Sequence, residues 1–197
     1  MSVLQNVLST VTGTAPFTQV DIDQQVIDMC VQYLPNHSAG AFSNPKANIV
    51  IADGVDFVNQ CAEKFDVIIS DSTDPVGPGE VLFTSRFYQG IKNCLNESGV
   101  FVAQNGVSFL QTQEVATTYQ RLSPLFTEAS FYSGAVPTYV GGIMTFAWAT
   151  DNEALKNVTL ETIEARYQAA NLSTRFYTPA VHKASFALPQ YVLDCLK

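Results

Sequence analysis

The sequence predicts an α/β fold, in which a mostly parallel sheet carries helices on both faces and an antiparallel edge near the C-terminus. Two observations lead to this prediction. Short apolar segments alternate with segments of helical periodicity through the first two thirds of the chain. In the last third, two consecutive apolar segments flank the loop PTYVGG, which is typical of two strands joined by a turn.

The first half of the chain contains three strand–helix pairs in succession. Pro35 ends the first helix, and Thr84 or Ser85 is the candidate N-cap of the third, with Gly99 beyond its end. The third strand is continuously apolar, as expected for a strand buried on both faces of a parallel sheet. The strands are expected at residues 17–22, 48–52 and 67–70, and the helices at 26–34, 55–62 and 84–95.

The second half continues the alternation and then changes character. A strand at 100–103 precedes a helix at 108–126, strands follow at 129–136 and 143–150, and helices at 160–170 and 189–196. Alternating strands and helices produce parallel neighbours with right-handed crossovers. With 197 residues and 47% hydrophobic content, and without a linker or repeat, we expect one domain over residues 1–197.

Charge and hydropathy exclude several classes of partner. The 10 basic and 18 acidic side chains give a net charge of -8, which argues against nucleic acid and anionic membranes and is compatible with a cationic ligand. No apolar run approaches the roughly 20 residues of a membrane span. The N-terminal segment lacks the features of a secretory signal, so we expect a cytoplasmic protein.

The cysteines and histidines predict neither disulfides nor a metal site. The cysteines are widely spaced and form no C-x-x-C pair: Cys30, Cys61, Cys94 and Cys195. We expect buried free thiols in a reducing compartment. His37 and His182 do not stand at ligand spacing with the cysteines or with each other, so no metal is expected.

Polar side chains follow the predicted parallel strands at their carboxyl ends, the edge where open α/β sheets bind ligands. Asp21 ends the first strand, Asp53 follows the second, Asp71 the third, and Gln104 with Asn105 the fourth. Each could also be an ordinary turn residue. An acid at the first position commonly binds ribose hydroxyls, and one at the second could accept from an adenine amino group.

The third strand leads into a loop, DSTDPVGPGE, with two acids three residues apart, Asp71 and Asp74. No lysine or arginine stands near them in the sequence, so they require external cations or the protonation of one acid. A polyamine would supply such cations. Pro75 and Pro78 restrict the loop and favour a preformed site.

Five blocks of the sequence resemble, in order, the spermidine synthases, which form the aminopropyltransferase family. They are QVDIDQQVIDMCVQYLP, IADGVDFV, FDVIISDSTDPVGPGEVLFTSRFY, FVAQNG and AVPTYVGGIMTFAWATD, and the resemblance runs from residue 17 to the C-terminus. The pattern D-S-T-D-P-x-G-P is the most specific, and YLPNH and FAWATD resemble the bacterial putrescine aminopropyltransferases. The resemblance implies a Rossmann-like, class I methyltransferase-like fold.

The resemblance also implies a reaction and roles for matching positions. The aminopropyl group of decarboxylated S-adenosylmethionine, a co-substrate, would pass to putrescine, giving spermidine and 5′-methylthioadenosine without a cofactor. Asp71 would accept the proton of the attacking amine, and a homodimer is what the family suggests. The other positions would bind substrates: Asp74 with Ser72 and Thr73 the polyamine, Gln104 and Tyr139 the amine, Asp21 (where the family usually has Glu) the ribose, Asp53 and Gly54 the adenine, and Pro78 the nucleoside.

The sequence departs from the family at its N-terminus. It lacks the β-rich N-terminal domain and the G-G-G-D-G loop, and residues 4–11 resemble the helix that follows that loop. We therefore expect a catalytic domain truncated relative to the family, with apolar surface left exposed on the strands that would flank the missing one. The alternative hypothesis is an inactive or partner-dependent homologue that binds polyamine or nucleoside without turnover.

A methyltransferase is a third hypothesis, based on fold alone. Asp71 and Asp74 argue against it, because the α-carboxylate of a methyl donor would meet two like charges. Trp148, in the last predicted strand, is interpreted as a core residue.

Overall fold

A computed structural model describes residues 16–197, so the helix expected at residues 4–11 lies outside the described part. The chain divides into two compact units, Met1–Cys61 and Ala62–Lys197. The single domain expected from the composition stays a prediction.

The first unit contains one β-α-β arrangement. Strand β1 (Phe17–Asp21) pairs in parallel with β2 (Ala47–Ile51), with Asp21 opposite Ile51. Between them lie α2 (Gln24–Tyr33), the short helix α3 (Pro35–Ser38) and the turn η1 (Ala41–Ser43), and α4 (Gly54–Gln60) follows β2. Helix α2 ends before Pro35, as predicted, because proline provides no amide hydrogen for the next turn.

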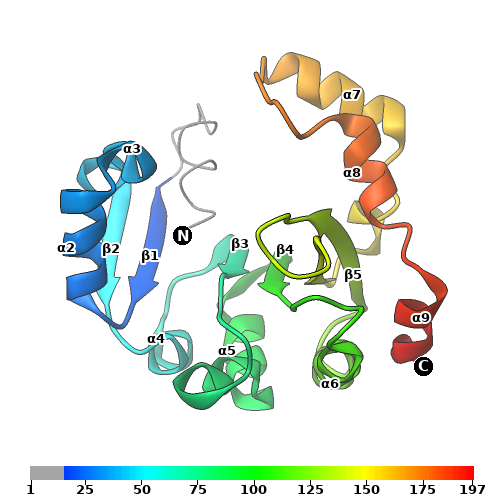
Figure 1. Ribbon diagram of the computed structural model, residues 1–197, viewed down its shortest axis with the longest axis horizontal. Helices are drawn as coiled ribbons and strands as arrows, with labels where there is room; N and C mark the ends of the chain where they lie inside the picture. The colour runs from blue at the N-terminus through cyan, green and yellow to red at the C-terminus, as the bar shows by residue number, and fades with distance from the viewer. Residues whose placement is uncertain (1–15) are drawn as a thin grey trace. The chain divides into compact units, whose positions relative to one another are not determined.

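The second unit contains a four-stranded sheet in the order β3-β4-β6-β5. Strands β3 (Phe65–Ser70) and β4 (Leu95–Gln104) are parallel, whereas β6 (Ile143–Thr150) is antiparallel to both β4 and β5 (Glu128–Ala135). The predicted antiparallel C-terminal edge is therefore confirmed (Figure 1). At the other rim, Val67 and Ile69 of β3 are 56% and 37% exposed. The truncation expected from the sequence stays a prediction.

Helices cover both faces of this sheet, as the α/β prediction requires. Helices α5 (Ser85–Cys94) and α6 (Thr112–Leu122) lie on one side, and α7 (Leu160–Ala169) and α8 (Pro179–Ser185) on the other (Figure 1). The rings of Tyr88 and Phe101 are 5.8 Å apart on the first face. On the opposite face, Trp148 lies 5.8 Å from Phe186 and is 7% exposed, so its interpretation as a core residue is confirmed.

Strand β4 and helix α6 begin at other residues than predicted, and glycines lie close to both differences. Strand β4 begins at Leu95, directly after α5. A Cβ atom on Gly99 would lie 3.1 Å from the carbonyl oxygen of Phe65, so a larger residue there would have to displace the backbone of β3 slightly. Helix α6 begins at Thr112 instead of residue 108, because the preceding residues form a loop in which Gly106 has φ +68°.

The remaining elements agree with the sequence pattern only in part. The turn η2 (Gly77–Phe83) follows the loop after β3, η3 (Glu153–Leu155) follows β6, and the expected C-terminal helix is divided into α9 (Gln190–Leu193) and η4 (Asp194–Leu196). Helix α8 was not predicted. Its signal in the sequence is Thr178, which caps the helix by accepting from the backbone of Val181, followed by Pro179 in the first turn.

Of the four cysteines only Cys94 is buried, whereas Cys30, Cys61 and Cys195 are half-buried, so the prediction of buried thiols was wrong for these three. Within residues 16–197, no group of three or more histidine, cysteine, aspartate or glutamate side chains is arranged to hold a metal ion. No helix in that range is long and apolar enough to cross a membrane.

Candidate active site

The carboxyl ends of β3 and β4 bring several of the predicted residues to one edge of the second unit. Ser70 and Ala103 are partners in the parallel register, so Asp71 follows β3 beside Gln104, the last residue of β4. Asp71 and Asp74 are both exposed to solvent. The edge therefore carries Asp71 beside Gln104, and Asp74 follows three residues later in the same loop.

The loop after β3 folds tightly on itself, which holds the acids in a defined conformation. The backbone of Val76 donates to the carbonyl oxygen of Asp74 at 2.7 Å. Gly79, from the following turn, approaches so closely that a Cβ atom would lie 2.3 Å from Thr73 Oγ1 and 3.3 Å from the Asp74 carbonyl oxygen. Ser72 is buried, with 8% of its surface exposed. This packing supports the expectation of a preformed loop.

Tyr139 lies in the β5–β6 loop at the same edge. Gln104 pairs with Phe146 near the start of β6, so the turn before β6 is next to the end of β4. This turn is closed by hydrogen bonds from Val136 to Gly142 at 2.8 Å and from Gly142 to Tyr139 at 3.0 Å. Tyr139 itself is 47% exposed. The structure thus brings Gln104 and Tyr139 to the edge that also carries Asp71.

In the first unit, Asp21 and Asp53 follow neighbouring parallel strands. Oδ1 of Asp21 accepts from the backbone of Asp23 at 2.9 Å, and the Asp21 carbonyl oxygen accepts from Ala52 at 2.9 Å. Asp53 is the N-cap of α4, and its Oδ1 accepts from Val55 at 2.7 Å and from Asp56 at 3.2 Å. Gly54 is the first residue of α4. These capping bonds fix the direction of the Asp53 side chain.

The predicted residues therefore form one group in each unit. The first group is Asp21, Asp53 and Gly54, and the second is Asp71, Ser72, Thr73, Asp74, Pro78, Gln104 and Tyr139. That both groups belong to one site stays a prediction.

A cavity of about 350 Å³ lies beside the second group, between η2 and α6. It borders the acidic loop at Pro75, but its lining includes neither Asp71 nor Asp74, so it is not the predicted amine site. Its walls carry the side chains of Glu80, Glu114 and Arg121.

Glu114 was not singled out from the sequence. Its two carboxylate oxygens accept from Asn105 Nδ2 and from Gln111 Nε2, each at 3.1 Å. Burial raises the pKa of the Glu114 carboxyl, the bond from Asn105 opposes this shift, and the negative charge of Asp74 adds to it. The signal available in the sequence was a glutamate three residues after Gln111 in the first turn of a helix.

Comparison with known proteins gives consistent matches over most of the chain. The family described as "Spermine/spermidine synthase domain" matches residues 7–161. The polyamine aminopropyltransferase of Klebsiella pneumoniae (strain 342) is 61% identical over 179 residues, which are 91% of this chain and 63% of the relative. The polyamine aminopropyltransferase of Shigella sonnei is 58% identical, over 62% of its length. The chain thus spans a little under two thirds of these curated relatives.

Solved structures give the same result for the fold. A spermidine synthase in complex with the transition-state analogue AdoDATO has a TM-score of 0.87 and 35% identity, over 98% of this chain and 64% of that one. The spermidine synthase of Thermotoga maritima has a TM-score of 0.85 and 34% identity over the same shares. Human methyltransferase-like protein 13, bound to SAH, is similar in fold alone, with a TM-score of 0.59 and 20% identity. The Rossmann-like prediction is confirmed.

Proposed function

The chain belongs to the spermine/spermidine synthase family, and from this premise we propose that it transfers the aminopropyl group of decarboxylated S-adenosylmethionine to putrescine. The products are spermidine and 5′-methylthioadenosine. The observation that carries the proposal is the closely packed acidic loop at the carboxyl end of β3, beside the end of β4. The curated relatives named polyamine aminopropyltransferase support the reaction class.

Asp71 is the proposed proton acceptor. The attacking nitrogen of putrescine is an ammonium at neutral pH and has no lone pair until it loses a proton. When that proton passes to the Asp71 carboxylate, the nitrogen forms a bond to the methylene carbon of the aminopropyl group. The carbon–sulfur bond breaks, its electron pair stays on sulfur, and the sulfonium leaves as a neutral thioether. Because no anion develops, the step requires no oxyanion hole.

The other acids and amides bind and orient the two substrates in this proposal. Asp74, with the backbone of Ser72 and Thr73, attracts the diamine, and Gln104 and Tyr139 lie where they can contact its nitrogen atoms. Alignment by fixed groups lowers the entropic part of the barrier. The nucleoside would be held by Asp21 at the ribose, by Asp53 and Gly54 at the adenine, and by Pro78.

Calorimetry and turnover test the proposal on the purified chain. We expect heat from 5′-methylthioadenosine and from spermidine, and formation of spermidine from the two substrates. Absence of heat from both ligands would refute the proposed function. Heat without turnover would instead support the partner-dependent homologue.

A further inference from the structure

The carboxylate of Glu114 binds side chains at both ends of the loop between β4 and α6, residues 105–111. Glu114 accepts from Asn105 at the start of this loop and from Gln111 at its end, each at 3.1 Å. Oε1 of Gln111 in turn accepts from the backbone of Val107 at 2.8 Å. A single side chain on α6 therefore connects both ends of the loop, and through Gln111 also its middle.

In these two hydrogen bonds, each carboxylate oxygen of Glu114 is an acceptor. Both partners are amide NH₂ groups, which donate, so an ionised carboxylate satisfies them together, whereas a glutamine at this position offers only one acceptor oxygen. Asn105 is fully buried, and its Nδ2 also donates to Thr118 at 3.2 Å. A lost acceptor would therefore leave a buried donor unsatisfied, at a cost of about 1–3 kcal/mol.

The loop 105–111 connects Glu114 to the amine end of the site. Gln104 immediately precedes Asn105, whose backbone is paired with that of Thr145 in β6 at 3.0 Å. Val107 supports the neighbouring turn, because a Cβ atom on Gly141 would lie 3.1 Å from Val107 Cγ1. Gly141 belongs to the turn that carries Tyr139.

We propose that Glu114 is a positioning residue for the amine substrate, because it holds the loop 105–111 and thereby the positions of Gln104 and Tyr139. This inference rests on the proposed function, in which those two residues contact the diamine. Glu114 does not touch the reacting atoms. Its effect passes through Asn105, Gln111 and Val107, by the hydrogen bonds and the packing described above.

The burial of Glu114 and the charge of Asp74 make its role dependent on pH. Asp74 acts on it through its negative charge, and Glu80 and Arg121 line the same cavity. Arg121 donates to the carbonyl oxygen of Phe83. Burial raises the pKa of nearby Tyr88 to about 12, so its phenol remains neutral. Because burial raises the pKa of Glu114, this carboxyl is protonated at a higher pH than an exposed glutamate, and protonation removes one acceptor.

Steady-state kinetics of Glu114→Gln test the proposal. We expect the KM for putrescine to rise about tenfold, which corresponds to about 1.4 kcal/mol, with little change in the KM for decarboxylated S-adenosylmethionine. The ratio of the two KM values for putrescine, variant over wild type, should approach one as the pH falls through the raised pKa of Glu114. Equal changes for both substrates, or a ratio independent of pH, would overturn the proposal.

Glu97→Gln is the matched control. It makes the same chemical change and the same change in net charge on an exposed residue near the opposite end of β4. We expect wild-type kinetics from this variant. If it raises the KM for putrescine as much as Glu114→Gln does, net charge explains the effect and the positioning role is refuted.

Hydrogen exchange separates this inference from the proposed function, because it requires no turnover. In Glu114→Gln, amide exchange should accelerate in residues 105–111 and also in 136–142, a segment whose link to Glu114 is the packing of Gly141 on Val107. Unchanged exchange in both segments would refute the inference even in an active enzyme. If Glu114→Gln does not fold, Gln111→Ala, which removes one donor and leaves the carboxylate, is measured in the same way.

Discussion

Replacement of Asp71 should slow the chemical step while the nucleoside still binds. Replacing it by asparagine keeps the size of the side chain but removes the group that accepts a proton. We expect turnover to fall by about 10²- to 10⁴-fold, the range for loss of a general base, while 5′-methylthioadenosine still binds. The measurement is kcat together with calorimetric affinity for the nucleoside.

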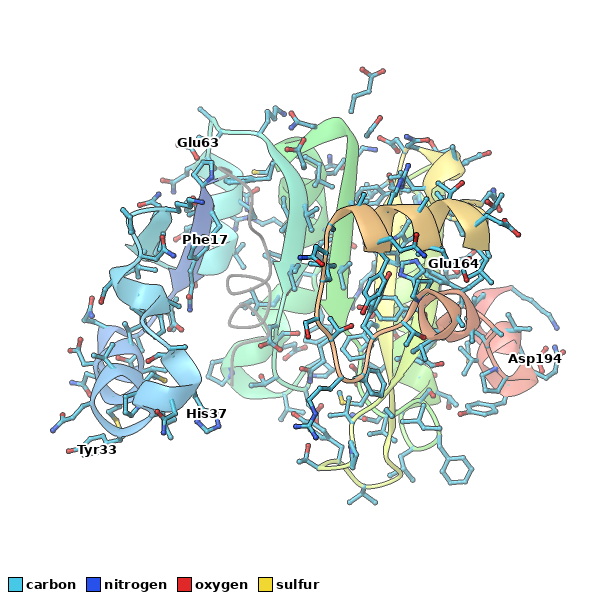
Figure 2. All side chains as sticks on the ribbon, turned by 90° about the horizontal axis from the view of Figure 1, so that it is seen from above. Phe17, Tyr33, His37, Glu63, Glu164 and Asp194 are labelled. Carbon is cyan, nitrogen blue, oxygen red and sulfur yellow. The ribbon has the colours of Figure 1, made fainter. Side chains whose placement is uncertain are left out.

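Asp194→Asn controls for the loss of one negative charge. Asp194 is exposed on the C-terminal turn, where it pairs with Lys197, and it projects outward from that turn (Figure 2). We expect wild-type turnover from this control. Wild-type turnover in Asp71→Asn itself would remove Asp71 from its assigned role.

His182 should make the stability of the protein depend on pH. It lies in α8 between aromatic rings, 5.8 Å from Tyr177 and 5.9 Å from Phe186, and Tyr177 Oη lies 3.3 Å from its Nδ1. Burial lowers the pKa of His182, and Lys183 adds to the shift. Because the pKa of His182 is lower in the folded protein, the unfolded chain binds this proton at a higher pH than the folded chain does. The free energy of unfolding therefore has its full value above about pH 6.5 and falls as the pH drops toward the pKa of His182 in the folded state.

Urea unfolding at about pH 7.5 and about pH 5.5 measures this dependence. We expect His182→Gln to reduce the difference in unfolding free energy between the two pH values. His37→Gln is the control, because His37 is exposed at the surface of the first unit (Figure 2) and should leave the difference unchanged. An equal difference in unfolding free energy between the two pH values in wild type and in His182→Gln would contradict the prediction.

At the scale of elements, the loop between β4 and α6 depends on one glycine. Gly106 has φ +68°, and a Cβ atom there would lie 2.6 Å from Gln111 Oε1, whereas Gly142 has φ +71° and nothing within 4 Å. Gly142→Ala should therefore lose only about 1–2 kcal/mol for the left-handed backbone. Gly106→Ala should lose about 1 kcal/mol more, because Gln111 must move and its bond to Val107 is broken.

The two alanine variants are compared by urea unfolding under identical conditions. Since φ is nearly the same at both positions, their difference reports the contacts of the added Cβ atom at Gly106 with Gln111 and Glu114. Equal losses of stability would show that Gln111 moves aside without cost, and would weaken the argument that this loop is rigidly held.

Most elements could be predicted from hydrophobic periodicity, and the exceptions have local causes. Strand β6 has the predicted bounds, because its apolar segment is bounded by glycines on one side and Asp151 on the other. Helix α6 began later than predicted because the side chain of Gln111 competes for a backbone amide, and periodicity does not detect such a bond. Helix α8 has seven residues, too few for a periodic signal.

At the scale of the whole molecule, the net charge of -8 should strengthen binding of a cationic diamine at low salt. We expect the KM for putrescine to rise when NaCl is increased from about 20 mM to about 0.5 M, because salt screens exposed charges such as Asp71 and Asp74. The affinity for 5′-methylthioadenosine, which is uncharged, serves as the control and should change little. A salt-independent KM would mean that the diamine is not attracted by exposed carboxylates.

The positions of four candidate residues could be predicted from their places along the chain. Asp21, Asp53, Asp71 and Gln104 each end or follow a strand, so the parallel register alone brings them to the edges of their sheets. Glu114 could not be found in this way. Its importance depends on Asn105 and Gln111, which face it only because the chain turns back at Gly106.

The rim strand β3 has a consequence for the behaviour of the protein at high concentration. Within residues 16–197 it pairs with β4 alone, and it presents Val67 and Ile69 to solvent with Asp66 as its one charged side chain. Strands of this kind are templates for aggregation, which natural proteins prevent with charges or prolines. Self-association of the isolated chain should therefore begin at β3, and a lysine in place of Val67 should suppress it.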